Sequence, residues 1–352
     1  MKTESDVCDS NGNDCKGGSM VMNLVQSYPL LGPVGEPLIQ PTCVSVSPTG
    51  RYAITDSKSC MIVVYTKMGL YSHHFSTLPK RLFYLYWNIA DHEPHSVAWL
   101  ADERLVYSQP SGGAVVICHG NGQRCGVISG RPLYEPFGLA VNSADQIFVV
   151  DRKKGRVLCY DCSGKLLRTI GGFGAVEGEL TLPHYVVTGP EDTIYVNNLP
   201  PGQTQNLVMI HKYSNRGAVI DSCVTSVTAE PSMGSLAVDD RGAIYQLDLK
   251  SQQIIQVREA ETNSENESES INTTCTYQEE VVMLDGLKQL VYAAIGRTSE
   301  VVCLDIGDMT VKIYTQTSLV MENGDTRHYM RDSREILNEF DSPPMSPTET
   351  NF

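Results

Sequence analysis

The chain has 352 residues, a formal net charge of −14 and a charged fraction of 19%. This length fits one large domain and leaves little room for a second, and the acidic balance argues against a general nucleic-acid-binding protein. No window approaches the roughly 18 consecutive apolar residues of a membrane-spanning helix, so the sequence predicts no membrane segment.

The N-terminal segment, residues 1–20, is polar and acidic, and we expect it to be a disordered arm. It lacks the apolar stretch of a secretory signal. The chain also holds an odd number of cysteines, 11. We therefore expect a cytoplasmic protein with reduced thiols.

A repeated unit fills residues 21–319. A short apolar strand, usually opened by proline, recurs at intervals of about 40–55 residues, a period typical of propellers. These openings lie near Pro41, Pro94, Pro136, Pro183, Met233 and Val281. A second strand follows each opening as RYAITD, RLVYSQ, QIFVVD, TIYVNN, AIYQLD and QLVYAA. One four-stranded sheet cannot bury its own apolar faces, but six arranged around an axis can. The sequence therefore predicts an all-β, six-bladed β-propeller, which we expect to be monomeric.

The third copy, residues 135–180, carries the fullest pattern. It reads PFGLAV, IFVVD, GRVLCYD and GKLLRTIGGFGAVEGEL. This copy resembles the NHL-repeat family, and the weaker resemblance extends over roughly residues 40–316. The resemblance implies a propeller like those that end tripartite-motif proteins, which bind RNA or protein. No RING, B-box or coiled-coil pattern precedes the repeats, so ubiquitin-ligase activity does not carry over to this chain.

Two further segments depart from the repeat. Residues 259–280 contain seven acidic residues and no basic one, which predicts a low-complexity loop between the fifth and sixth copies. Residues 320–352 are polar and predict a disordered tail. Ser342-Pro and Ser346-Pro in this tail fit proline-directed phosphorylation.

Topology predicts which charges share a face. In an up-and-down sheet, the loops between second and third strands lie on the same side as the connections between sheets. The acidic loop is expected to leave from this side too. The predicted binding residues on this side are Lys58, Lys80, Arg81, Arg131, Arg152, Lys153, Lys154, Phe173, Lys250 and Arg297.

The leading functional interpretation is a non-enzymatic scaffold that binds a protein partner through this face. Following the resemblance, it could serve as a substrate-recognition module in ubiquitin-linked regulation. A second interpretation is RNA binding through Arg152–Lys154, with basic side chains on phosphates and aromatic rings on bases. The alternative for the same three residues is an ordinary solvated turn.

A third interpretation is an enzyme. His95 and His184 occupy the same position in their copies, after Pro94 and Pro183. Neutral imidazole is a common metal ligand, and the pair resembles the zinc-binding histidines of peptidyl-hydroxyglycine lyase propellers. Those enzymes use three such histidines, and a catalytic zinc wants three protein ligands. The other interpretation is that both histidines only cap the starts of strands. Apart from this pair, no catalytic constellation or cofactor motif is evident.

Overall fold

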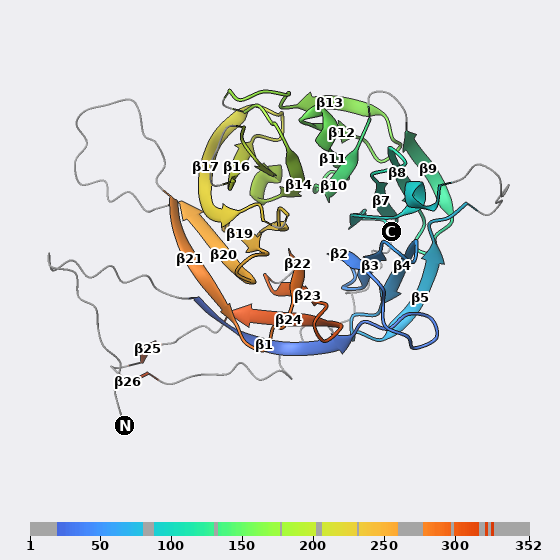
Figure 1. Cartoon of the computed structure of the whole chain (residues 1–352), viewed down its shortest axis with the longest axis horizontal. Helices are drawn as coiled ribbons and strands as arrows, with labels where there is room; N and C mark the ends of the chain where they lie inside the picture. The colour runs from blue at the N-terminus through green and yellow to red at the C-terminus, as the bar shows by residue number, and fades with distance from the viewer. Residues whose placement is uncertain are drawn as a thin grey trace, which may run out of the picture.

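In the computed structural model, the described residues form a ring of β-sheets around a central axis (Figure 1). They comprise residues 20–79, 88–129, 133–176, 178–201, 206–230, 232–259, 277–296 and 299–316, with the backbone of 321–322 and 325–326. No helix in these ranges is long and apolar enough to cross a bilayer. The all-β propeller predicted from the repeats is confirmed.

Four sheets have four strands each, in chain order from the centre outward. The first contains β2 (Pro41–Val46), β3 (Tyr52–Asp56), β4 (Met61–Tyr65) and β5 (Tyr71–Ser76). The second contains β6 (Val97–Trp99), β7 (Leu105–Gln109), β8 (Ala114–Cys118) and β9 (Arg124–Ser129). The third contains β10 (Pro136–Val141), β11 (Ile147–Asp151), β12 (Arg156–Tyr160) and β13 (Leu166–Ile170). The fourth contains β14 (Pro183–Thr188), β15 (Ile194–Asn198), β16 (Leu207–Tyr213) and β17 (Val219–Thr228).

A larger sheet of eight strands completes the ring, in the order β18-β19-β20-β21-β1-β24-β23-β22. Its first half contains β18 (Leu236–Val238), β19 (Ile244–Asp248), β20 (Gln253–Glu259) and β21 (Tyr277–Leu284). Its second half contains β22 (Leu290–Ile295), β23 (Val301–Asp305), β24 (Thr310–Gln316) and β1 (Met20–Pro29). The short elements are η1 (Ile89–His92), η2 (Arg152–Lys154), η3 (Pro190–Asp192), β25 (Met321–Glu322) and β26 (Asp325–Thr326).

The strand pattern explains the layers. The second strands β3, β7, β11 and β15 are buried along their whole length, whereas the outer strands β5, β9 and β13 are mostly exposed, each with a single buried position near its end. Continuous runs of Val, Ile, Leu and Tyr suit strands covered on both faces. The core therefore lies between neighbouring sheets, and only their outer edges face solvent.

The inner strands all begin on one side of the ring, which we call the proline face. Each opening residue pairs with the last residue of the second strand, as in Pro41↔Asp56, Pro136↔Asp151 and Pro183↔Asn198. The loops from second to third strands and the connections between sheets lie on this face. The opposite side, the turn face, carries the turns from first to second and from third to outer strands.

A recurring polar clamp holds the connections at the proline face. The Asp56 carboxylate accepts hydrogen bonds from the backbone N–H groups of Ile39 and Gln40. Asp151, Asn198 and Asp305 accept equivalent pairs from the connections ahead of β10, β14 and β22. Such side chains satisfy backbone donors that no strand partner reaches. They therefore fix the loops from which a ligand site on this face would be built.

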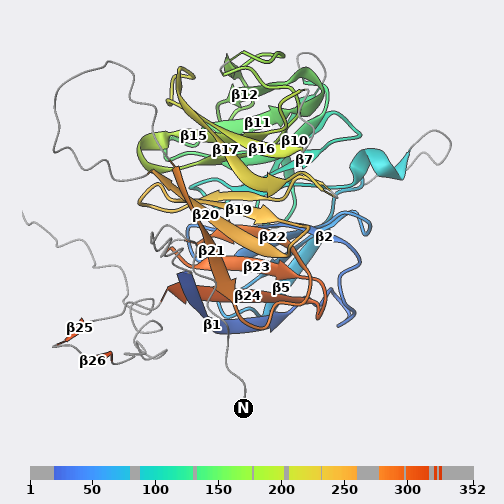
Figure 2. The same cartoon turned by 60° about the vertical axis from the view of Figure 1, so that its left-hand side comes forward.

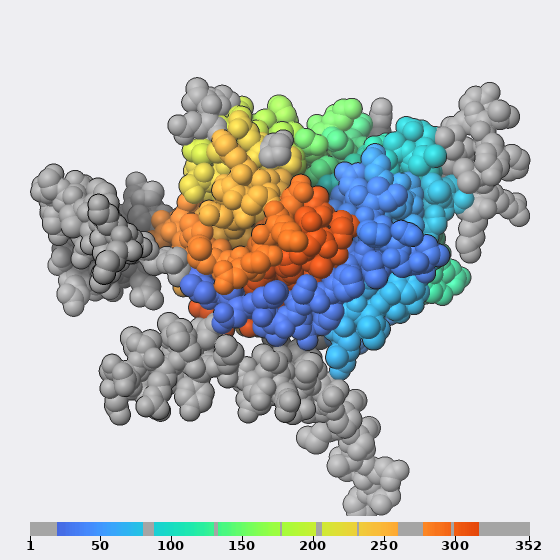
Figure 3. Space-filling view, turned by 60° about the horizontal axis from the view of Figure 1, so that its bottom comes forward, coloured from blue at the N-terminus to red at the C-terminus, as the bar shows by residue number. Residues whose placement is uncertain are grey.

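The N-terminal strand closes the ring. β1 pairs antiparallel with β24 and, over Met20–Met22, parallel with β21, and Figure 2 shows it beside β24 at one edge of the molecule. In Figure 3 the blue N-terminal segment runs along the rim beside the orange residues of the last sheet and the lighter blue residues of the first. The repeat pattern predicted a first strand only at Pro41, so a strand at Met20–Pro29 was not expected.

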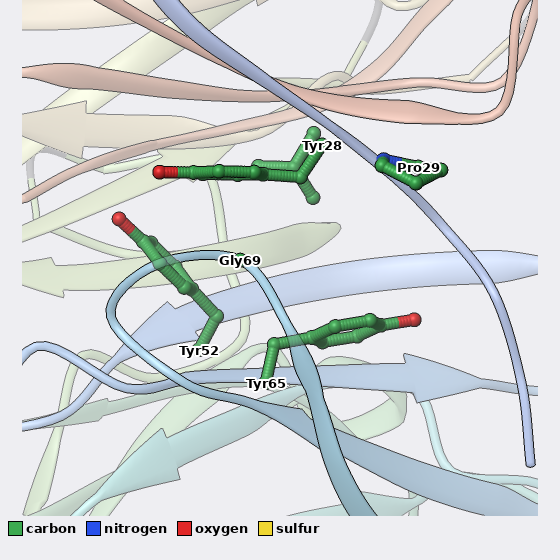
Figure 4. A pocket seen from close by; sticks show the side chains of 6 residues that line it. Tyr28, Pro29, Tyr52, Tyr65 and Gly69 are labelled. Atoms are coloured by element: carbon green, nitrogen blue, oxygen red, sulfur yellow. The ribbon is translucent and has the colours of Figure 1, made fainter.

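Tyr28 shows that β1 takes the part of an outer strand. The turn glycines of the second, third and fourth sheets, Gly122, Gly164 and Gly217, lie against outer-strand side chains of the sheets before them, Phe75, Ile128 and Ile170. In the first sheet, Gly69 lies against Tyr28 in the same way. Figure 4 shows the Tyr28 ring beside the Gly69 turn, with Tyr52 and Tyr65 around a small crevice. The last sheet thus packs on the first as any sheet packs on its successor.

Two predictions about the last repeats were wrong. Val281, expected to open the sixth copy, lies in the outer strand β21, and the corresponding inner strand is β22, which begins at Leu290. The acidic loop was expected between the fifth and sixth copies on the proline face. Its flanking residues Glu259 and Tyr277 are instead paired at the end of the β20–β21 hairpin, so it leaves from the turn face. Residues 260–276 themselves lie outside the described residues, as do 1–19 and most of 317–352.

Candidate functional site at the hub of the proline face

Six equivalent positions surround the axis where the inner strands begin. Each is the second residue of its opening, and together they form what we call the hub mouth. These residues are Thr42, His95, Phe137, His184, Gly234 and Val291. The two predicted histidines therefore do lie at one level of the hub, on either side of the sheet that carries Phe137.

Hydrogen bonds between sheets hold the backbone of the hub mouth. The hydroxyl groups of Thr42 and Thr55 both donate to the carbonyl oxygen of His95, at 2.9 and 3.1 Å. The Ser108 hydroxyl donates to the carbonyl oxygen of Phe137 at 2.7 Å. In each case a polar side chain of one sheet bonds the inner strand of the next, so the mouth is preorganised by its scaffold.

Phe137 joins the two histidines into one cluster. Its ring centroid lies 3.8 Å from that of His95 and 5.2 Å from that of His184, which it meets edge to face. His184 is buried, and its Nδ1 lies 3.2 Å from the carbonyl oxygen of Leu182. A carbonyl can only accept, so Nδ1 carries the proton in the neutral ring.

The hub mouth keeps both imidazoles neutral. Burial lowers the pKa of His95 to about 3, with further lowering by the charges of His184 and Arg152. Burial lowers the pKa of His184 to about 4, and the Arg152 guanidinium lowers it further. Groups with such low pKa values are poor general bases near pH 7. As neutral rings they are instead suited to hydrogen bonding and to ligation of a cation.

Aromatic side chains fill the axis below the mouth. Tyr185 lies 6.1 Å from His95 and 5.8 Å from Tyr292, measured between ring centroids. Both tyrosines are buried, and burial raises the pKa of both phenols. They share one core cluster with Cys43. The mouth therefore has an aromatic floor.

Arg152 reaches into this cluster from η2. Its guanidinium carbon lies 5.1 Å over the Phe137 ring, a cation–π geometry. Its nearest carboxylate contact joins Nη1 and Glu135 Oε1 at 3.8 Å, which is long for an ion pair. Two buried atoms, Arg152 Nε and His95 Nδ1, have no hydrogen-bond partner among the described residues. The mouth thus combines one cation, neutral rings and unused polar atoms.

A basic-aromatic patch, defined as Tyr134, Lys153, Lys154 and Phe173, lies beside the mouth. The Lys154 ammonium sits 4.4 Å from the Tyr134 ring centroid. Phe173 is 70% exposed and packs next to Gly155. Lys153 is exposed, and no salt bridge to Lys153 or Lys154 occurs in the described part of the chain. This arrangement agrees with the expected grouping of Arg152–Lys154 and Phe173.

The other predicted cations are not part of this patch. Lys58 pairs with Glu93 at 2.9 Å, and Lys250 pairs with Glu230 at 3.5 Å. Arg297 lies outside the described residues. The remaining predicted residues also lie outside the described ranges: Lys80, Arg81, Arg131, Ser342 and Ser346.

The two hub histidines remain a pair. Within the described ranges, no group of three or more His, Cys, Asp or Glu side chains is placed to hold a metal ion. His95 and His184 therefore fall short of the three protein ligands of a catalytic zinc.

Sequence reasoning missed the inward direction of Arg152 and the tyrosine floor. Arg152 looked like one member of the solvated turn DRKKGR, and nothing in that string distinguishes it from Lys153. A signal for Tyr185 and Tyr292 existed, because both stand one residue after a hub-mouth position. It was hidden at Tyr292 by the wrong assignment of the sixth opening.

Comparisons with known proteins support the fold. No family model and no curated protein matches the chain. A streptogramin B lyase structure matches with a TM-score of 0.56 and 11% identity, over 83% of this chain and 97% of that one. Virginiamycin B lyase from Staphylococcus aureus matches with a TM-score of 0.51 and 13% identity, over 82% and 87%. A catalytically inactive histidine-to-alanine variant of the latter enzyme, with quinupristin, matches with a TM-score of 0.52 and 12% identity, over 86% and 90%.

These structures correct one expectation. The chain was predicted not to be an enzyme because its sequence shows no complete catalytic constellation. The three solved structures named above are of lyases, so the prediction was wrong to exclude catalysis. At 11–13% identity the similarity shows the fold alone, and fold does not carry activity with it.

Proposed function

We propose that the chain is a six-bladed propeller of NHL type that binds a protein partner through the proline face. Four complete sheets and the two four-stranded halves of the large sheet support the count of six. The motif residues of the third copy, which form β10 to β13 and the connection after them, support the type.

The basic-aromatic patch is the observation that carries this proposal. Lys153 and Lys154 lie in η2 without a salt bridge in the described part of the chain, directly after Asp151, whose carboxylate holds the neighbouring connection at Glu135. Phe173, beside them, exposes 70% of its surface. Exposed aromatic rings beside unpaired cations are typical of interaction sites rather than of ordinary surface.

The surroundings favour a protein segment that is both acidic and apolar. Connections on the proline face also expose Ile39, Ile89 and Val176, which are 72%, 60% and 70% exposed. Aliphatic side chains contribute little to binding a phosphate backbone but bury well against a peptide. The net charge of −14 also disfavours the binding of RNA, a long polyanion, more than the binding of a short acidic motif in a protein. A role in substrate recognition for ubiquitin transfer would need a ligase in trans and rests on the resemblance alone.

The test compares two full-length double variants with equal charge change. Lys153→Glu/Lys154→Glu alters the patch. Lys165→Glu/Arg216→Glu alters exposed residues of the turn face. Proteins retained by the wild type are identified by mass spectrometry, and each candidate is then purified and titrated by fluorescence anisotropy.

We expect the patch variant to weaken direct binding by at least ~10-fold, as is common for central charged residues, and the turn-face variant to bind as wild type. Equal weakening of partner binding in both variants would overturn the proposal. Unchanged binding in both variants would also overturn it. Retention that disappears after ribonuclease treatment would favour RNA as the ligand.

Lyase-like chemistry at the hub mouth is a second candidate. The three similar structures named above are of lyases, and one of them is a catalytically inactive histidine-to-alanine variant. In this chain His95 and His184 lie in the hub, against Phe137. Incubation with quinupristin, followed by liquid chromatography, tests it directly. Conversion that His184→Ala abolishes supports this function, and an unchanged substrate peak with and without added divalent metal rejects it for that substrate.

A further inference from the structure

We propose that the hub mouth is a binding site for a carboxylate, with Arg152 as its cation and the rings of His95, Phe137 and His184 as its walls. This inference goes beyond the proposed function, because it concerns the axis of the ring rather than the patch beside it. It holds whether the carboxylate belongs to a small molecule or to a peptide.

The unused edge of the guanidinium is the first argument. Nη1 of Arg152 faces Glu135, whereas Nε is buried without a partner and Nη2 has no hydrogen bond among the described residues. Nε and Nη2 form the edge that binds a carboxylate through two parallel hydrogen bonds. A buried donor left unpaired is costly, so a ligand that satisfies it gains affinity.

The surroundings of Arg152 are the second argument. The guanidinium lies over the Phe137 ring, and His95 packs against the same ring. His95 Nδ1 is a second buried polar atom without a partner. The carboxylate of Asp151, which precedes Arg152 in the chain, is occupied by Arg156 and by two backbone N–H groups. The positive charge of Arg152 is therefore only partly compensated, and the flat walls suit a planar anion.

Arg168 in the same sheet provides a matched comparison. Its guanidinium also stacks on a phenylalanine, at 5.5 Å from the Phe148 ring centroid. Its Nη2, however, donates to Gln146 and Asn215, at 2.9 and 2.8 Å. Nε of Arg168 is likewise buried, with no hydrogen-bond partner in the described part of the chain. The two stacked arginines therefore differ at Nη2, which is engaged in Arg168 and has no hydrogen bond in Arg152 among the described residues.

The experiment is an NMR titration of the full-length protein, observed at the arginine Nε–Hε resonances. Acetate and succinate are the probes, chloride at equal ionic strength is the control, and inorganic phosphate is the competing anion. The Arg152 resonance is assigned from Arg152→Lys, and that of Arg168 from Arg168→Lys. Folding of each variant is checked by the dispersion of its backbone amide spectrum.

We expect a saturable shift of the Arg152 resonance with the carboxylates, and none at Arg168. Arg152→Lys should weaken the binding, followed at backbone amides of η2, by ~10-fold or more, because lysine offers no planar fork. Arg168→Lys and the patch variant Lys153→Glu/Lys154→Glu should retain the site, so its failure is distinguishable from failure of partner binding.

The proposal would be overturned if the Arg152 resonance shifted linearly with carboxylate concentration and chloride caused the same shift. An equal shift of the Arg168 resonance would also overturn it. Tighter binding of phosphate than of either carboxylate would also overturn it. Should Arg152→Lys fail to fold, the Arg152 Nε–Hε resonance is assigned in the wild type by triple-resonance correlation to its own backbone amide, and the wild-type titration then decides.

Discussion

The imidazole of His95 packs against the ring of Phe137 from the next sheet, with centroids 3.8 Å apart and planes inclined by 36°. This contact buries a titratable group at the axis and, with the nearby charges of His184 and Arg152, lowers its pKa to about 3. The Phe137 side chain therefore shields the His95 imidazole from water.

Replacing Phe137 with alanine should expose His95 to water. We expect the pKa of His95 to rise toward its ordinary value of about 6.5, as measured by NMR titration of the imidazole protons. The variant should also lose about 2 kcal/mol of unfolding free energy, less than a fully buried phenylalanine. Phe148→Leu, remote from the mouth, is the control. An unchanged pKa in Phe137→Ala would show that the ring does not shield His95.

Buried neutral histidines should make stability depend on pH. Burial lowers the pKa values of His184 and His211 to about 4, below the unfolded value of about 6.5. The unfolded state then binds more protons between these values, so this stability is fully present above pH 6.5 and is lost as the pH falls toward 4. Each histidine contributes a slope of at most ~1.4 kcal/mol per pH unit.

Urea unfolding at a series of pH values measures this slope. His211 bonds the Ser222 hydroxyl through Nδ1 at 2.8 Å, and His211→Gln keeps a polar group there without the titration. We expect a flatter pH dependence in this variant. Carboxylates titrate below this pH window. In Asp305, for example, hydrogen bonds from Lys312 and from backbone N–H groups lower the pKa of the carboxyl group. An identical slope in His211→Gln would exclude the histidine as its source.

The sequence predicted the first four sheets well because their signals are local. Apolar runs, turn residues and proline-led openings all lie within one copy, and β2, β10 and β14 begin at the prolines that were named. Such features depend on neighbouring residues only, so a single chain displays them.

The last two sheets could not be predicted in the same way. The acidic segment interrupts the β20–β21 hairpin, so the strand at Val281 follows a long gap and looks like a new opening. The strand that completes the last sheet lies more than 280 residues earlier, at Met20–Pro29. Strand pairing over such a separation leaves no periodic trace. The direction of Arg152 was equally hidden, because a turn motif does not show which side chain faces the axis.

The Asp151 clamp should be essential for the proline face. Its carboxylate accepts from the backbone N–H groups of Tyr134 and Glu135, and Arg156 donates to it at 3.2 Å. Asp151→Ala would leave these donors unpaired in a buried site, and we expect a loss of about 3 kcal/mol in unfolding free energy. Asp151→Asn should lose less, because Asn198 shows that one amide oxygen can accept both backbone donors. Thermal and urea unfolding measure the stability of the two variants. Equal losses of unfolding free energy in Asp151→Ala and Asp151→Asn would contradict the stabilising role of these hydrogen bonds.

Ring closure depends on the contact between Tyr28 and Gly69. A Cβ atom on Gly69 would clash with Tyr28 Cγ, and the backbone there has φ +71°. Gly69→Ala should therefore lower the free energy of unfolding by more than backbone strain alone would. The additional loss, caused by overpacking, should be about 1–3 kcal/mol. Gly35 has φ +81° with nothing within 4 Å of an added Cβ, so Gly35→Ala measures the strain by itself.

Hydrogen exchange of the β1 amides should accelerate in Gly69→Ala and not in Gly35→Ala. The double variant Tyr28→Ala/Gly69→Ala should be less destabilised than the sum of its single variants, because the clash is gone. Additive losses would mean that β1 closes the ring without this contact.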